Sequence, residues 1–318
     1  MRMSHRLQAV VVAAIWGVNF VAIEMGLRDL PPLVLTALRF AVVTVPLVFL
    51  VPRPTARARY VVAYGLILGV LKFGALFTAL ALGMGAGLGS LVLQAQALVS
   101  VLLAALLLRE RPTRRQLAGV LVGSAGIGMI AVAGGGHATA IGFALTLFAA
   151  ASWAVANVVV RVSGETRPLS LLVWSSLVPP LPLLGLAAVV DGPDVVRDSV
   201  AGLSWPGLAA LGYVAYVSTL VGFGIWNRLI GHYSLARVAP FSLLVPVFGL
   251  AASWLFLHER MTADEALAAL IVLVGLALVV GGTRKPTTAP ADAELPPAPP
   301  RLWASRALPG NAYDDSAR

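Results

Sequence analysis

Lys72 is the residue in this sequence best placed to do chemistry, because it stands alone in the apolar run LGVLKFGAL (68–76). No acidic residue lies one helical turn away on either side. A cation in such a place can receive a carboxylate from a ligand or lose its proton. The alternative is a structural lysine that reaches a polar surface or pairs with a distant acid. We expect Lys72 to face a cavity and to bind ligand there.

Amide and indole side chains interrupt other apolar runs and are expected to share this binding site. They are Trp16, Asn19, Gln94, Gln96, Trp153 and Asn157. Asn157 follows Trp153 by one helical turn, so the two share a helix face, whereas Gln94 and Gln96 point in different directions. An aromatic wall with amides beside it suits a small zwitterion. The alternative for the amides is helix packing through hydrogen bonds.

Three further residues are candidates for a gate or a hinge. Arg39, in ALRFAVV (37–43), is expected in the outer third of its apolar run. There it could pair with Glu24 and control access to the binding site. The alternative is that both charges simply reach the lipid headgroups. Pro246 lies at the centre of its run and frees a backbone carbonyl, which suits a hinge. Trp174 opens another run, where anchoring at the membrane interface is the default interpretation.

The elements that position these residues are long apolar runs. The chain of 318 residues is 59% hydrophobic and 12% charged, whereas soluble domains carry about 25% charged residues. A helix needs roughly 20 apolar residues to cross a bilayer. Ten such runs cover approximately residues 7–27, 33–52, 60–82, 85–108, 115–133, 140–162, 168–189, 205–229, 235–257 and 264–283. The sequence therefore predicts an all-α membrane protein with ten transmembrane helices.

The positive charges predict the orientation of these helices. The net charge is +9, but the charges lie in short gaps between apolar runs, which argues against a nucleic-acid interface. If the N-terminus is inside, the inner segments up to Lys285 hold fifteen Lys and Arg residues. The outer loops then hold three, Arg28, Arg197 and Arg260. Because such residues gather on the cytoplasmic side, we expect both termini there.

Two turns, LLLRERPTRR (106–115) and FLHERMTADE (256–265), indicate an internal repeat. An offset of 149 carries Glu110 to Glu259 and Thr113 to Thr262, although the first turn is basic and the second acidic. Five spans per half would turn the second copy upside down, so the charge would follow the side of the membrane. We therefore expect inverted halves, 1–135 and 136–284, with a substrate site between them and alternating access. The polar tail 285–318 is predicted to be disordered.

Five stretches resemble a known family: 16–40, GMGAGLGSLVLQAQA (83–97), 170–179, VGFGIW (221–226) and 237–260. They resemble EamA-type carriers of the drug/metabolite transporter superfamily, in particular its bacterial cysteine/O-acetylserine exporters. The resemblance implies an inner-membrane exporter of small amino-acid-like metabolites, driven by an ion gradient with protons as a candidate. Other drugs or metabolites are the alternative cargo.

An intramembrane enzyme and a channel are remote alternatives. An enzyme would need paired acids, a His cluster or an activated Ser within the spans, and the polar residues here form no ring that suits a channel. The sequence contains no Cys and only four His residues, and it predicts no metal site and no cofactor. The oligomeric state is not predicted.

Overall fold

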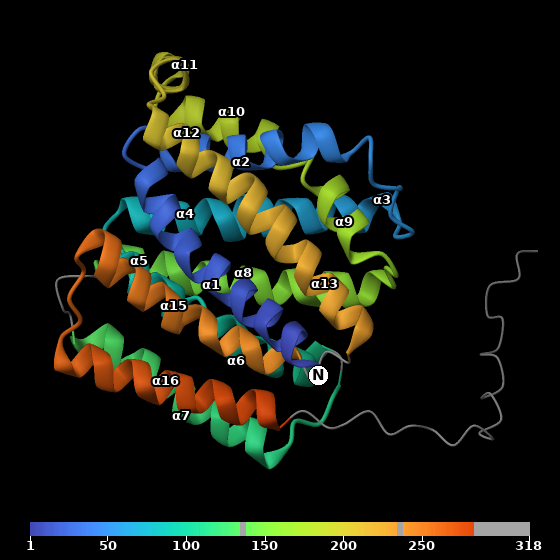
Figure 1. Ribbon diagram of the computed structural model, residues 1–318, viewed down its shortest axis with the longest axis vertical. Coiled ribbons are helices and arrows are strands. Elements are labelled where there is room, and N and C mark those ends of the chain that lie inside the picture. Colours follow the sequence, from blue (N-terminus) through green and yellow to red (C-terminus); the bar gives the residue numbers. More distant parts are fainter. Residues whose placement is uncertain (108, 134–137, 234–237, 283–318) are drawn as a thin grey trace, which may run out of the picture. The chain divides into compact units, whose positions relative to one another are not determined.

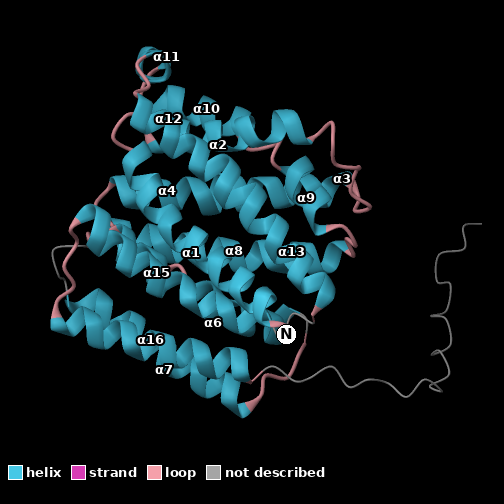
Figure 2. Ribbon diagram, viewed as in Figure 1, coloured by secondary structure: helices cyan, strands magenta, loops and turns pink. Residues whose placement is uncertain are grey.

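A computed structural model describes residues 1–107, 109–133, 138–233 and 238–282. Helices make up nearly all of this part of the chain, which contains no strand beyond an isolated bridge between Met84 and Ala138 (Figure 2). The expected tail 285–318 and the boundary between the two expected halves lie outside the described residues.

The helices follow one another as a series of long, often interrupted rods (Figure 1). The first part of the chain forms α1 (Met3–Gly26), α2 (Pro32–Leu47), α3 (Ala58–Tyr64), η1 (Gly65–Gly74), α4 (Ala75–Ala81), α5 (Ala86–Val92), α6 (Ala95–Leu107) and α7 (Arg114–Ala133). The second part forms α8 (Ala140–Ser163), α9 (Pro168–Ser175), α10 (Pro180–Val190), α11 (Pro193–Ala201), α12 (Trp205–Gly212), η2 (Tyr213–Gly222), α13 (Phe223–His232), η3 (Ala239–Leu243), α15 (Leu244–Ala252), η4 (Ser253–Leu257) and α16 (Ala263–Gly281).

Nine helical stretches in the described residues are long and apolar enough to cross a membrane. This confirms the expected all-helical fold with many spans. The expected second span is the shorter helix α2, which has 16 residues and contains Pro46 next to its end. The expected run continued to residue 52, but the chain turns after Leu47. Arg39 therefore lies at the middle of α2 rather than in the outer third of a longer helix.

The connections between helices gather in two groups that alternate along the chain. In one group, hydrogen bonds join Asp29 with Ser204, Leu82 with Thr139, and Ala86 with Glu259. In the other group they join His5 with Tyr233, Thr55 with Glu165, and Glu110 with Arg161. Successive spans thus run in opposite directions, as expected for a chain that crosses a membrane repeatedly.

The two Glu-Arg turns have the same backbone structure. The residue before each Glu has a positive φ, 54° at Arg109 and 58° at His258. The helices that follow begin alike, because Thr113 and Gln116 form the same reciprocal side-chain-to-backbone hydrogen bonds as Thr262 and Glu265. Residues 149 positions apart therefore occupy equivalent local structures.

Helices α7 and α16, which follow these turns, pack side by side along their length (Figure 1). Gly119 lies against Gly275, and Gly126 lies against Val272 and Ala268. The contacting residue numbers rise along α7 while they fall along α16, so the two helices are antiparallel. Small residues permit this close approach of the two backbones.

Both parts of the chain interrupt their α-helices at equivalent places. The π-helices η1 and η2 each have ten residues, and η2 lies 148 positions after η1. The span after η1 breaks at Leu93 and Gln94, and its counterpart changes from a 3-10 helix to an α-helix between Leu243 and Leu244. Such irregular backbone in a membrane is tolerated where protein or a cavity satisfies it, and often marks functional sites.

Candidate functional site

Lys72 lies in the π-helix η1 and is buried, with 4% of its surface exposed. Its Nζ atom lies 3.1 Å from the centre of the Phe73 ring and 4.7 Å from the centre of the Trp153 ring. Such cation–π contacts stabilise a cation in a desolvated place by about 2 kcal/mol. The structure thus brings together two of the expected site residues, Lys72 and Trp153, and adds Phe73.

Arg39 reaches the same aromatic ring from α2. Its Cζ atom lies 4.1 Å from the centre of Phe73, and the residue is only 4% exposed. Nη2 donates a hydrogen bond to Oγ1 of Thr219 in the π-helix η2, over 3.3 Å. Nη1 is buried and has no hydrogen-bond partner among the described residues. Arg39 therefore belongs to the Lys72 cluster, whereas Glu24, its expected partner, lies in the last turn of α1.

Trp16 extends the aromatic surface on the side of α1. It packs against Phe223 and Trp226 with ring centres 5.1 and 5.2 Å away, and its Nε1 donates to the backbone carbonyl of Ser218. Phe223 packs against the same buried apolar cluster as Phe73 and Trp153. Aromatic side chains thus connect Trp16 with the surroundings of Lys72.

The expected amide residues take separate roles in the structure. Gln94 is buried, and its Nε2 donates to the carbonyl of Ser242 over 3.4 Å. Gln96 accepts a hydrogen bond from Nδ2 of Asn157, which is exposed. Asn19 is buried, and its Oδ1 has no partner in the described part of the chain. None of the amides has a described contact with Lys72 or Arg39.

The remaining hinge and gate candidates, Pro246 and Trp174, have no described contact with Lys72 or Arg39. Pro246 is buried in α15, one turn after the 3-10 helix η3. Trp174 donates to the carbonyl of Val51, and its ring faces Arg53 at 5.5 Å. It therefore ties α9 to the connection after α2.

Phe73 and Thr219 were missed by the sequence analysis. Phe73 adjoins Lys72, but only the fold shows that its ring also faces Arg39. Thr219 lies two positions before Val221, the repeat equivalent of Lys72, so the repeat offset does not single it out.

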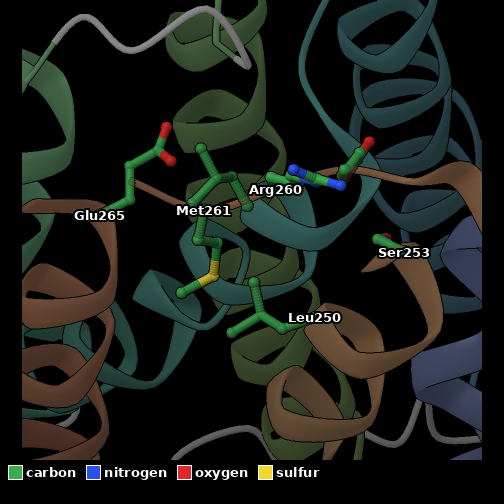
Figure 3. Close-up of a pocket in the computed structure, with 7 residues that line it drawn as sticks. Leu250, Ser253, Arg260, Met261 and Glu265 are labelled. Atoms are coloured by element: carbon green, nitrogen blue, oxygen red, sulfur yellow. The ribbon is translucent and has the colours of Figure 1, made fainter. Parts of the chain in front are cut away.

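A small pocket lies beside the turn that joins η4 to α16 (Figure 3), and neither Lys72 nor Arg39 lines it. It has a volume of about 10 Å³ and is lined by Leu250, Ser253, Arg260, Met261 and Glu265, among others. That volume holds about one water molecule. Glu259, which also lines it, accepts hydrogen bonds from the backbone N–H groups of Ala86 and Gly87. The pocket is therefore too small for a metabolite. It lies where the turn that contains Glu259 is hydrogen-bonded to the start of α5.

Comparison with known proteins settles the family. The EamA-like transporter family matches residues 4–132 and again residues 140–281. This chain belongs to the EamA-like transporter family. EamA-like relatives include the "Probable amino-acid metabolite efflux pump" of Escherichia coli, 42% identical over 282 residues that cover 87% of this chain and 94% of that protein. The protein of the same name from Salmonella typhimurium is 41% identical and covers 88% of this chain and 96% of its own length.

A more distant EamA-like relative is the "Probable terminal-alkyne amino-acid exporter" of Streptantibioticus cattleyicolor. It is 30% identical over 294 residues, which cover 89% of this chain and 93% of that protein. One crystal structure aligns over 91% of this chain and 100% of its own, with a TM-score of 0.61 and 21% identity. At that identity the alignment supports the fold alone.

Proposed function

We propose that this EamA-like protein is a secondary transporter of the bacterial cytoplasmic membrane that exports small amino-acid-like metabolites. The observation that carries the proposal is the cluster of Lys72, Arg39 and Phe73, in which two cationic groups lie buried on one aromatic ring. Buried cations in membrane helices typically mark substrate or ion pathways. The names of the relatives from Escherichia coli and Salmonella support amino-acid metabolites as the cargo. Cysteine and O-acetylserine are candidates because the sequence resembles exporters of these compounds.

We propose that the transporter has ten spans in two inverted halves and works by alternating access. The family match to 4–132 and again to 140–281 supports the division into halves. The matching turns 149 residues apart and the antiparallel packing of α7 and α16 support the inversion. In such carriers the halves rock around a site between them, and interrupted helices line that site.

In this proposal Lys72 receives the carboxylate of the cargo, and the aromatic rings of Trp153 and Trp16 form the wall around it. Gln94 and Pro246 hold and bend the interrupted helices that move during transport. Trp174 anchors the cytoplasmic end of α9 at the membrane interface. Both termini are cytoplasmic, as the fifteen-to-three distribution of Lys and Arg supports. Protons are the candidate coupling ion.

Lys72→Met tests the proposal in proteoliposomes loaded with labelled amino-acid derivatives. We expect the variant to insert and fold, because removing a midplane charge relieves roughly 2.5–3.5 kcal/mol. We expect transport of carboxylate substrates to fall strongly while any neutral cargo is spared. The matched control is Val221→Met at the repeat-equivalent position, where the side chain is 46% exposed and transport should be unchanged. Parental transport by Lys72→Met would refute the role of Lys72.

A further inference from the structure

The positive charges of Arg39 and Lys72 restrict the class of compound that this cluster can bind as cargo. The Arg39 guanidinium and the Lys72 ammonium lie 4.1 and 3.1 Å from the centre of the same Phe73 ring. The distance between the two charged groups therefore cannot exceed the sum of these two distances. Both side chains are buried, so little solvent separates them. Like charges held this close repel one another, and an anion between or beside them removes that repulsion.

No acidic side chain compensates these two cations in the described part of the chain. The acidic residues before the tail lie in connections or in the first or last turns of helices. The described ion pairs are Arg161 with Glu110, and Arg197 with Asp194 and Asp198, all with exposed side chains. Burying an unpaired charge costs several kcal/mol per ion. The cluster therefore has a deficit of negative charge that a ligand can supply.

The hydrogen-bond donors of Arg39 favour a carboxylate as that ligand. Nη2 is held by Thr219, which fixes the plane of the guanidinium, while the buried Nη1 has no partner in the described residues. A guanidinium can bind both oxygens of a carboxylate, and a lysine adds a compact charge with rotatable donors.

A free ammonium group on the ligand would be poorly received in this place. It would need an acid, a free oxygen acceptor or an open aromatic face, and none of the expected amide side chains has a described contact with Lys72 or Arg39. The face of Phe73 is already shared by two cations, and Trp153 faces Lys72. A zwitterion would bring a third positive charge into the cluster, whereas an anion brings only the missing negative charge.

We propose that Arg39 and Lys72 form one anion site, and that the preferred cargo is an amino-acid derivative of net negative charge rather than a zwitterion. This inference rests on the proposed function and specifies its substrate class. It also makes Arg39 a substrate-binding residue instead of a gate.

Two isomers provide a matched pair of ligands. O-acetylserine carries a carboxylate and an ammonium group, whereas N-acetylserine has the same atoms but an uncharged amide in place of the ammonium. Their binding to the purified full-length protein can be compared by calorimetry and by ligand-induced thermal stabilisation, at a mildly acidic pH where the O-acetyl group does not migrate. We expect N-acetylserine to bind about tenfold tighter or more, a difference of about 1.4 kcal/mol.

Arg39→Gln should remove this preference, because it deletes one of the two charges and half of the carboxylate clamp. Arg39→Lys should keep the preference with weaker binding, because the charge stays and the fork is lost. The matched control is Arg59→Gln. Arg59 also lies over an aromatic ring, that of Tyr60 at 4.8 Å, but it is exposed and remote from the cluster. Its removal should leave both affinities unchanged.

Equal affinity of the parent protein for the two isomers, or tighter binding of O-acetylserine, would overturn the inference, even if Arg39→Gln fails to fold. Transport in proteoliposomes separates the inference from the proposed function. Binding of N-acetylserine without transport of any tested compound would support the anion site and refute the carrier. Transport of both isomers with equal affinity would leave the carrier standing and refute the anion preference.

Discussion

Gln94 donates a hydrogen bond to the carbonyl oxygen of Ser242, which lies in the 3-10 helix η3, four positions before Pro246. Proline has no N–H group, so the α-helical bond from residue 246 cannot form, and the backbone N–H of Leu244 and the side chain of Gln94 bond this carbonyl instead. Gln94 itself lies where its own span is broken, between α5 and α6. The side chain at the break in one half is therefore hydrogen-bonded to the backbone at the break in the other half.

This relationship predicts a coupling between Gln94 and Pro246. Gln94→Leu should lower stability by about 1 kcal/mol, because it removes one hydrogen bond to the Ser242 carbonyl. In a Pro246→Ala background the new N–H group can take over, so the same substitution should cost much less. A double-mutant cycle of thermal unfolding in detergent measures the difference. Gln96→Leu is the control, since Gln96 bonds Asn157 instead and should not couple to residue 246.

The contact between α7 and α16 should tolerate no added carbon at Gly119. A Cβ atom there would lie 2.6 Å from the carbonyl oxygen of Gly275 and 2.7 Å from the amide nitrogen of Val279. Because both neighbours are backbone atoms, Gly119→Ala should cost about 1–3 kcal/mol. Gly128→Ala, in the same helix but with open space around the site, should be neutral or stabilising. Equal melting temperatures for the two variants would refute the close packing.

Glu259 and Glu110 are repeat equivalents with different partners. Glu259 accepts two backbone hydrogen bonds at the start of α5, whereas Glu110 pairs with the exposed Arg161. Glu259→Gln should cost about 1–3 kcal/mol, as expected for hydrogen bonds to a charged group. Glu110→Gln should cost about 0–1 kcal/mol, because exposed ion pairs contribute little. Thermal unfolding of the two variants side by side tests the ranking.

Glu165 should make the thermal stability of the protein depend on pH in the acidic range. Slight burial raises the pKa of its carboxyl group, but hydrogen bonds from Ala56, Thr55 and Arg167 lower it by more, so the pKa lies below its ordinary value. The stabilisation is therefore present at neutral pH and is lost as the pH falls through the folded-state pKa. The difference in melting temperature between the parent and Glu165→Gln should shrink below about pH 4. A difference that stays constant with pH would refute this contribution.

The orientation of the two Glu-Arg turns can be measured directly. Reporter domains fused after Arg115 and after Glu265 should lie on opposite sides of the membrane, cytoplasmic and external respectively. The physical reason is the odd number of spans in each half, together with the preference of Arg and Lys for the cytoplasmic side. Reporters on the same side would exclude an inverted repeat.

The sequence predicted the helices well because a bilayer imposes long apolar runs, and these are visible without knowledge of the fold. The repeat was visible because the Glu-Arg-x-Thr turn serves a local purpose in both copies. The pairing of Lys72 with Trp153 at one site was also expected, and the structure brings these two side chains together.

The sequence could not predict the position of Arg39 or the helix interruptions. Arg39 moves to the middle of its helix because α2 stops at Leu47, and helix ends are poorly marked in apolar sequence. The π-helices and the break at Gln94 contain no proline to mark them. They depend on packing between helices distant in sequence, which no local pattern records.

Two buried cations with no acidic partner among the described residues have an electrical consequence for the cell. A cargo that supplies the missing negative charge carries that charge outward when it leaves the cytoplasm. The membrane voltage is negative inside and favours this movement by about 2.3 kcal/mol per charge for each 100 mV. The resting voltage would therefore drive the export of such a cargo even without a proton gradient, and collapsing the voltage with an ionophore would slow it.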